Sequence, residues 1–423
     1  MYPLRSLLLA GLCLCAQVSA APLVKRGSSA ITLTEPIAPR DDPWYSEPDG
    51  FENDAPGTIL RIRKAPGNLT TITTNCSAAY NILYRTTNSL YKPTWAVTTL
   101  FVPKNHTDAL LSYQIPYDTA DLNASPSYAL YSNTPTDVTA SLGKGWFVNV
   151  PDYEGPLASF TAGVLSGHAT IDAVRAVLSA KECLKLPDGL KYALWGYSGG
   201  ALASEWAAEL QVQYAPELTF SGVALGGLTP NITSVLTTIN NKLMAGLAVS
   251  SIIGTCNQYP EIMAMLESKL KPTGDLNSTS FLAAQNMTLT ETLVAFAGKN
   301  ISAFFVDGEM DILNPITDKL ISKDGIMGYH GVPQAPIFAY KAVEDEVSPI
   351  ADTDKLVTSY CAMGANILYQ RNSIGGHSAE QTNGRAAASA WLDSVLGGTY
   401  SKTYNTTGCT IQDVALNVTS SPY

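Results

Sequence analysis

The stretch KYALWGYSGGAL, Lys191–Leu202, constrains the fold more than any other part of this chain. An apolar run that suits a strand ends at Gly196, and an alanine-rich segment that suits a helix follows Gly200. Between them Ser198 completes a Gly-x-Ser-x-Gly pattern in the strand–turn–helix context of a nucleophile elbow. Such a turn is so tight that its flanking positions have no room for side chains. The pattern predicts a catalytic serine at position 198, and the alternative is an ordinary Gly-rich turn between a strand and a helix.

Strands alternate with helices on both sides of this turn. The predicted strands are Ile59–Arg63, Ala78–Arg85, Trp95–Val102, Leu110–Ile115, Gly145–Val150, Tyr192–Trp195, Phe220–Leu225, Pro336–Ala342 and Asn366–Gln370. Helical periodicity fits Thr170–Leu178, the segment from the elbow to about Gln213, and Arg385–Leu396. This order predicts an α/β fold with a mostly parallel sheet flanked by helices.

The pattern of apolar residues changes from alternating strands and helices to mainly helices after residue 229. Residues 230–331 are predominantly helical in pattern, with Leu236, Ile239 and Leu247 on one face, and only Ala303–Val306 resembles a strand. We expect an inserted helical cap or lid at 230–331, which divides the core into an N-terminal part, 27–229, and a C-terminal part, 332–423.

The N-terminus has the pattern of a secretory leader. Arg5 precedes an apolar run, and Val18–Ala20 forms a small-residue cleavage site, so residues 1–20 are expected to be a signal peptide. A dibasic pair ends residues 21–26, which we expect to be a propeptide unless the pair is simply a solvated surface feature. No later stretch is long and apolar enough for a membrane helix.

Sequons support secretion independently. Asn-x-Ser/Thr acceptor sites occur at Asn68, Asn75, Asn105, Asn123, Asn231, Asn277, Asn286, Asn300, Asn405 and Asn417. This density suits a glycosylated, extracellular protein. Five cysteines remain beyond the leader, and without metal-type spacing they predict two disulfides and one further thiol in an oxidising compartment.

The net charge of −10, without any Lys/Arg cluster, argues against nucleic-acid binding. Acidity on this scale mainly promotes solubility.

A serine nucleophile needs a base, and the chain has only four histidines. In hydrolases with this kind of turn the acid and then the histidine follow the serine, which excludes His106 and His168. His330 follows Ser198 but lies at the end of the predicted cap. His377 lies in a loop after the last predicted strand, where such a base belongs, and is favoured over His330 and over an ordinary surface histidine.

The acid is expected in the loop after the strand Pro336–Ala342. Its candidates are three adjacent carboxylates, Glu344, Asp345 and Glu346. Asp345 is the preferred acid, and the two glutamates are expected to be solvated.

An oxyanion hole requires two N–H donors. One is expected from the backbone of Gly199, the residue after the nucleophile. The other should come from the loop after Leu110–Ile115, where Pro116 has no N–H, so Tyr117, Asp118 or Thr119 must supply it.

Long blocks of the chain resemble the fungal secretory lipases, the family that includes lipase A of a Candida-type yeast. The blocks that carry the resemblance are Asp42–Arg63, Ser112–Leu130, Gly145–Ala176, Trp195–Ala208 and Val343–Ile350, followed by the loop of His377. The resemblance implies an α/β-hydrolase core with a helical cap, Ser198 as nucleophile, Asp345 as acid and His377 as base. It also implies that the oxyanion donors are the N–H groups of Asp118 and Gly199.

The same resemblance implies a disulfide between Cys361 and Cys409. A second bridge of the family begins at the position that Asn123 occupies here, so it is absent or re-routed, and Cys76–Cys256 is the re-routing considered.

The leading hypothesis is therefore a secreted serine lipase that hydrolyses triacylglycerols through an acyl-enzyme, with no cofactor or metal. We expect a monomer that meets its lipid or small-molecule ester at a lipid–water interface. The alternative is an esterase for short-chain or secondary-metabolite esters, and a non-catalytic binding protein of the same fold is a third reading.

Overall fold

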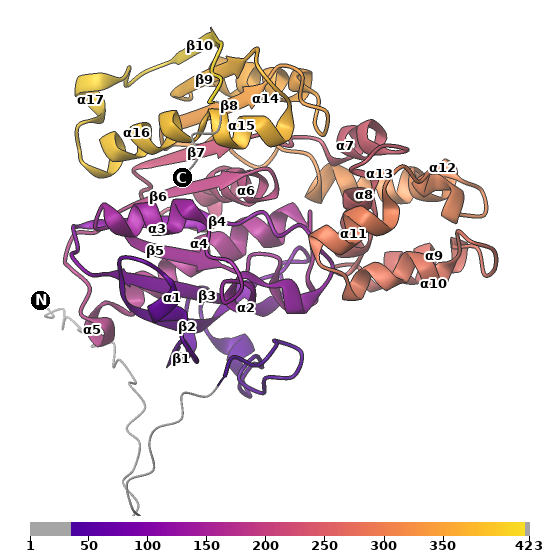
Figure 1. The fold of residues 1–423 in the computed structure, drawn as a ribbon, viewed down its shortest axis with the longest axis horizontal. Helices are drawn as coiled ribbons and strands as arrows, with labels where there is room; N and C mark the ends of the chain where they lie inside the picture. The colour runs from indigo at the N-terminus through magenta and orange to yellow at the C-terminus, as the bar shows by residue number, and fades with distance from the viewer. Residues whose placement is uncertain (1–34, 419–423) are drawn as a thin grey trace, which may run out of the picture.

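A single ten-stranded sheet organises the molecule, of which the computed structural model describes residues 35–418. The predicted leader and propeptide lie outside the described residues. The strands are β1 (Ile59–Lys64), β2 (Cys76–Thr87), β3 (Pro93–Pro103), β4 (Ala109–Gln114), β5 (Phe147–Pro151), β6 (Lys191–Tyr197), β7 (Gly222–Gly226), β8 (Ile337–Ala342), β9 (Ile367–Asn372) and β10 (Cys409–Val414). Their order across the sheet is β1-β2-β3-β5-β4-β6-β7-β8-β9-β10 (Figure 1).

The sheet is antiparallel at one end and parallel elsewhere. Strands β1, β2, β3 and β5 pair antiparallel, and every pairing from β5 through β4 to β10 is parallel. The fold class predicted from the sequence is confirmed. Parallel strands need crossover connections, and these put helices on both faces of the sheet.

Two layers of helices cover the sheet. The core helices are α1 (Leu69–Ile72), α2 (Pro126–Ala129), α3 (Thr136–Gly143), α4 (Gly163–Ser179), α5 (Lys181–Leu184), α6 (Gly199–Tyr214), α14 (Ile350–Ala362), α15 (His377–Asn383), α16 (Arg385–Leu396) and α17 (Tyr400–Thr403). On one face α4, α6 and α14 bury side chains such as Trp206 and Tyr360. On the other face α3 and α16 pack around Trp391.

Between β7 and β8 the chain leaves the sheet and forms a separate group of helices, which we call the cap. These helices are α7 (Ile232–Ile239), α8 (Ala245–Cys256), α9 (Pro260–Lys269), α10 (Ser278–Leu282), α11 (Leu289–Phe296), α12 (Glu309–Ile312) and α13 (Pro315–Asp324). They have their own apolar core and project beside the strand ends, at the right of Figure 1. The strand-like Ala303–Val306 is a 3₁₀ helix, Ile301–Phe304, followed by a single bridge from Phe305 to Leu270.

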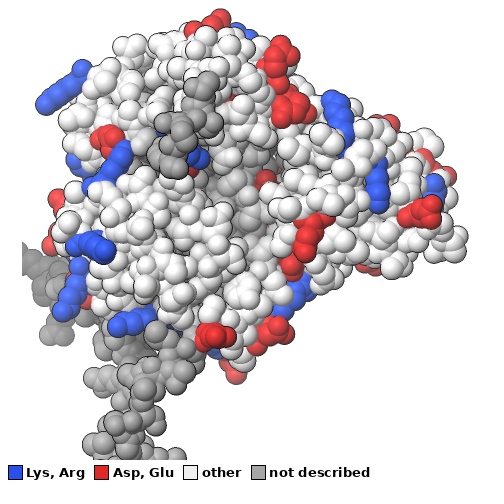
Figure 2. All heavy atoms as spheres, in the orientation of Figure 1, with Lys and Arg blue, Asp and Glu red and all other residues white. Residues whose placement is uncertain are grey.

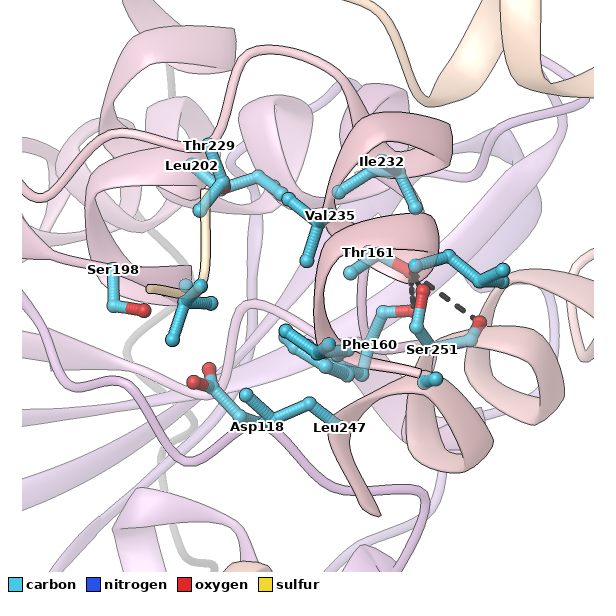
Figure 3. Close-up of a pocket in the computed structure, with 15 residues that line it drawn as sticks. Asp118, Phe160, Thr161, Ser198, Leu202, Thr229, Ile232, Val235, Leu247 and Ser251 are labelled. Atoms are coloured by element: carbon cyan, nitrogen blue, oxygen red, sulfur yellow. Dashed lines mark hydrogen bonds between the residues drawn. The ribbon is translucent and has the colours of Figure 1, made fainter. Parts of the chain in front are cut away.

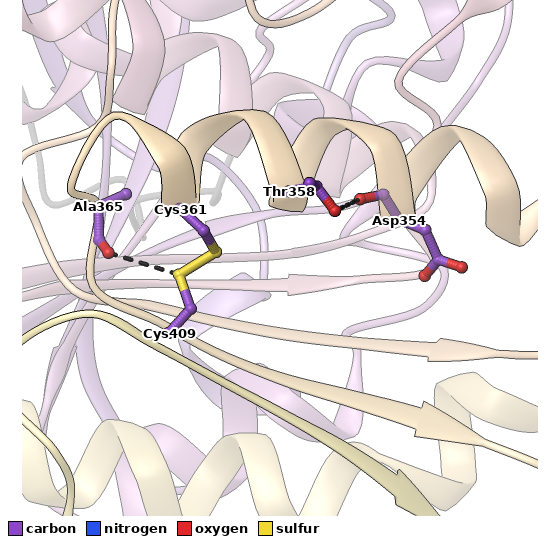
Figure 4. The surroundings of a disulfide bond; sticks show 5 residues. All are labelled: Asp354, Thr358, Cys361, Ala365 and Cys409. Atoms are coloured by element: carbon purple, nitrogen blue, oxygen red, sulfur yellow. Dashed lines mark hydrogen bonds between the residues drawn. A yellow bond between two sulfur atoms is a disulfide. The ribbon is translucent and has the colours of Figure 1, made fainter.

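One disulfide ties the end of α14 to the start of β10. Figure 4 shows Cys361 bonded to Cys409. Cys409 opens β10, an edge strand that the sequence pattern did not predict. The Cys76–Cys256 bridge was wrong, because both thiols are free and are buried in different clusters. Cys76 packs with the core against Phe101, and Cys256 packs inside the cap against Leu266.

Most of the sequons lie on the surface, where charged side chains are scattered. Seven acceptor asparagines are exposed, and Asn123, Asn231 and Asn277 are half-buried. On the face drawn in Figure 2, Lys, Arg, Asp and Glu side chains are scattered, and its described residues form no extended patch of one sign. Within residues 35–418 no helix has the length and apolarity needed to cross a membrane.

Candidate active site

Ser198 lies on a strained turn between the central strand β6 and helix α6. Its backbone has φ 53° and ψ −120°, a conformation that costs energy for any residue with a side chain. A Cβ at Gly196 would lie 2.1 Å from the backbone of Gly200, and a Cβ at Gly200 would lie 2.0 Å from the carbonyl oxygen of Gln114. The backbone N–H of Ser198 donates to Gly226 on β7 at 2.8 Å. The two glycines are therefore required by backbone packing, and the serine is held at the strand end.

His377 lies beside this serine although the two are far apart in the sequence. It is the first residue of α15, just beyond β9, and its Nε2 is 2.8 Å from Ser198 Oγ. Its backbone N–H donates to the Glu346 carboxylate at 2.7 Å, and its carbonyl accepts from the Tyr197 hydroxyl. These two contacts fix the start of α15 against the loops after β6 and β8.

Asp345 completes a continuous chain of hydrogen bonds. Its Oδ2 lies 2.7 Å from His377 Nδ1, and its Oδ1 accepts the backbone N–H groups of Val347 and Ser348 at 2.9 and 2.8 Å. Lys341 on β8 donates to the same Oδ2 at 2.8 Å. Burial alone would raise the pKa of Asp345, but the His377 hydrogen bond and the Lys341 charge outweigh it and hold that pKa well below its ordinary value. The acid is therefore a carboxylate at neutral pH.

The alternatives for acid and base make other contacts. Glu344 and Glu346 are exposed, and Glu346 accepts the backbone N–H of His377, whereas Asp345 is buried and contacts the imidazole. His330 contacts the Glu209 carboxylate through Nδ1 at 3.1 Å, at the C-terminal half of α6. Among the candidates raised by the sequence, Ser198, Asp345 and His377 are the three that the fold brings together.

The two predicted oxyanion donors are neighbours. Asp118 lies in the loop after β4 with φ 45°, and a Cβ at Gly199 would lie 1.9 Å from Asp118 Oδ1. Gly199 opens α6, and the first N–H groups of a helix have no acceptor within it. Burial raises the pKa of the Asp118 carboxyl to about 7.

Ser198 lines two neighbouring cavities, which also share Asp118, Leu247 and Val347. The inner cavity is further lined by Gly199 and by apolar side chains, several of them from the cap (Figure 3). The outer cavity is more open and is also lined by His377, Leu289 and Leu293. An ester carbonyl at Ser198 would therefore have one substituent in each cavity.

Two supporting residues, Lys341 and Tyr197, were given no role by the sequence analysis, and Glu346 was considered only as an acid. The only signal for Lys341 was its place inside an otherwise apolar strand, because a buried lysine needs an anionic partner. Within residues 35–418 no cluster of three or more His, Cys, Asp or Glu side chains is arranged to hold a metal ion.

A parallel sheet of this order, with a serine on the turn after a central strand and His and Asp on later strand ends, defines an α/β-hydrolase. Residues 131–402 match the sequence profile of the family described as Secretory lipase, and the chain belongs to that family. The family resemblance seen in the sequence is thereby confirmed, and the chain is a carboxylic-ester hydrolase of the lipase or esterase kind.

Similar proteins include both esterases and lipases. The trichothecene C-3 esterase of Fusarium sporotrichioides is 51% identical over 411 residues, covering 93% of this chain and 92% of that protein. Lipase A of Arthroderma benhamiae is 36% identical over 383 residues, with 86% and 81% covered. The crystal structure of Candida antarctica lipase A superposes with a TM-score of 0.80 at 26% identity, covering 90% of each chain.

Proposed function

We propose that this protein is a secreted serine hydrolase of carboxylic esters, with Ser198 as nucleophile, His377 as general base and Asp345 as the acid that orients the base. The observation that carries the proposal is the unbroken line of contacts from Ser198 Oγ to His377 Nε2 and from His377 Nδ1 to Asp345 Oδ2, at 2.8 and 2.7 Å. This geometry lets the imidazole accept the serine proton while the carboxylate stabilises the resulting charge.

The reaction then proceeds in two halves. Ser198 Oγ attacks the ester carbonyl carbon and gives its proton to His377. The C–O bond to the alcohol breaks, His377 protonates the departing oxygen, and an acyl-serine remains. Water gives a proton to His377 and attacks the acyl carbon, the bond from that carbon to Ser198 Oγ breaks, and His377 returns the proton to Oγ, which releases the carboxylic acid and restores Ser198.

Each tetrahedral intermediate carries a negative oxygen. We assign its donors to the backbone N–H groups of Asp118 and Gly199. The contact between Asp118 Oδ1 and the Gly199 backbone supports this assignment, because it keeps the two segments side by side.

The two cavities suggest how the ester lies. His377 must reach the departing oxygen, and it lines the outer cavity. The alcohol therefore occupies the outer cavity and the acyl group the inner one, whose lining is largely apolar.

The substrate we favour is an ester of a secondary-metabolite alcohol of the trichothecene kind. The support is the 51% identity to a trichothecene C-3 esterase, against 36% to a lipase of the same family. A triacylglycerol lipase is the second candidate, supported by the family itself.

Secretion is part of the proposal. The leader pattern and the exposed sequons support an extracellular, glycosylated protein. Secretion from a fungal host, followed by N-terminal sequencing and glycosidase treatment, tests it.

The test of function compares three substrates. Purified protein is given p-nitrophenyl acetate, a trichothecene C-3 acetate and emulsified triolein, with Ser198→Ala as the matched control. We expect turnover of the first two esters and its loss in the variant. Turnover of triolein above that of the acetates would favour the lipase, and no turnover of any ester would leave a binding protein.

A further inference from the structure

The inner cavity ends at a cluster of hydroxyl groups. In Figure 3, Ser198 and Asp118 lie at one end of the cavity, and Thr161 and Ser251 lie at the other. The walls between these ends are mostly apolar. Apart from Thr229, they are formed by apolar side chains such as Phe160, Leu202, Leu236 and Leu247. Apolar walls suit a hydrocarbon chain, whereas the hydroxyl groups at this end do not.

Every hydroxyl of the cluster has a partner. Thr161 Oγ1 lies 2.7 Å from Ser251 Oγ, 2.8 Å from Thr255 Oγ1 and 2.7 Å from the carbonyl oxygen of Phe160. A threonine hydroxyl has one proton and two lone pairs, so Thr161 can donate to the carbonyl and accept from both neighbours. All three hydroxyl residues are buried. Separating them would leave polar groups unpaired in an apolar cavity, so the cluster resists opening.

The cluster also lies where the cap is held against the core. Ser251 and Thr255 belong to α8 of the cap, and Thr161 belongs to the loop before α4 of the core. The two backbones touch, since a Cβ at Gly254 would lie 2.5 Å from Phe160 N. Gln258, just beyond α8, donates to the Ser159 hydroxyl at 2.8 Å. This part of the cap is therefore packed directly on the core.

A second apolar cavity lies behind the cluster. It is lined by cap side chains that include Cys256, Leu266 and Ile312. It shares Ile232, Leu236 and Ser251 with the inner cavity. These shared residues form a partition between the two cavities, and Thr161, itself bonded to Thr255, holds Ser251 in place within it.

We propose that this partition sets the acyl specificity of the enzyme: it ends the acyl site at Ser251 and limits substrates to esters of short carboxylic acids. The inference rests on the proposed function, since it assumes that the acyl group on Ser198 occupies the inner cavity. Its chemical basis is steric exclusion by a wall that Thr161 holds in place. Beyond this wall lies the second apolar cavity, into which a longer chain would extend if the wall were removed.

The test is a chain-length series of p-nitrophenyl esters, from acetate through octanoate to laurate, with kcat/KM measured for each. Ser251→Gly removes the side chain at the centre of the partition and should join the two cavities. The matched control is Ser250→Gly. Ser250 is its fully buried neighbour on α8 and is not among the described residues that line the two cavities. Both variants carry the same cost of glycine in a helix, and Ser251→Gly also loses the hydrogen bond to Thr161, so its thermal midpoint should fall further.

We expect the wild type to lose activity steadily beyond butyrate. Ser251→Gly should raise the laurate-to-acetate ratio of kcat/KM by about tenfold or more, the size of effect that small changes in an apolar pocket produce. Ser250→Gly should keep the wild-type ratio. A second variant, Leu236→Ala, opens the same partition from α7 and should shift the ratio in the same direction.

Two results would overturn the inference. One is a wild type that hydrolyses laurate as well as acetate. The other is a ratio in Ser251→Gly and Leu236→Ala within about twofold of the wild type while both variants still hydrolyse acetate. An enzyme inactive on every ester, acetate included, would instead refute the proposed function and remove this inference with it.

Discussion

The Lys341 ammonium should stabilise the active-site loop most where Asp345 is ionised. Its Nζ donates to Asp345 Oδ2 at 2.8 Å, and both side chains are buried. Burial would raise the pKa of Asp345, but the His377 hydrogen bond and the Lys341 charge outweigh it and hold that pKa well below its ordinary value. The ion pair therefore contributes stability at neutral pH, and this contribution is lost as the pH falls through the pKa of folded Asp345.

The perturbation is Lys341→Met, which keeps the length of the side chain and removes the charge. Removing one partner of a buried ion pair costs stability. We expect a loss of about 3 kcal/mol in urea unfolding at pH 7, because Asp345 keeps three other donors. Without the Lys341 charge the pKa of folded Asp345 should lie closer to its ordinary value, so the loss should shrink as the pH falls below about 4.

The assay is urea unfolding at pH 7 and at pH 3. The control is Lys355→Met, which makes the same change of net charge at an exposed position on α14. A loss in Lys341→Met that is as large at pH 3 as at pH 7, or no larger at pH 7 than the loss in Lys355→Met, would refute the electrostatic reasoning.

Three further predictions test other parts of the molecule. Asp345→Asn should lower kcat by about 10⁴-fold, while Glu344→Gln should change it by no more than about twofold. The reverse result would assign the role of the acid to Glu344. Burial keeps Asp118 protonated up to about pH 7, so its contribution to stability is full below about pH 4 and is lost as the pH rises through 7. In thermal melts Asp118→Asn should therefore match the wild type near pH 4 and be more stable at pH 8, by up to about 4 kcal/mol; a difference independent of pH would contradict this. Replacing Cys361 and Cys409 together by serine opens a loop of separation 48 and should cost about 4 kcal/mol in non-reducing urea unfolding, and an unchanged midpoint would contradict this.

The central strands and the elbow could be predicted from the sequence because their signals are local. An apolar run ending in Gly-x-Ser-x-Gly specifies strand, turn and helix within a few residues. The terminal helix Arg385–Leu396 was predicted to the residue, since its apolar positions follow one face. Strand β10 was missed because it is an edge strand, largely exposed, and lacks the alternation that marks a half-buried strand.

The residues of the site could be predicted where their order along the chain carries information. They could not be predicted where only the packing of distant segments defines them. Order along the chain excluded His106 and His168, and loop position favoured His377 over His330 and reduced the acid to three neighbours. The hydrogen bond between Thr161 and Ser251 joins two distant segments, and nothing in either segment marks the contact. Lys341 was treated as one residue of a strand, because its partner is defined only after the loop has folded.

The cap begins and ends on neighbouring strands. The chain leaves the sheet after β7 and returns as β8. These two strands pair with each other, from Val223 opposite Ile337 to Gly226 opposite Tyr340. The ends of the insertion are therefore held together by the sheet, so its length adds little entropy cost to folding. Insertions, deletions and rearrangements in the cap can accumulate without shifting the strand that carries Ser198 or the strands that precede Asp345 and His377. A lineage can in this way change the substrate while it keeps the catalytic apparatus.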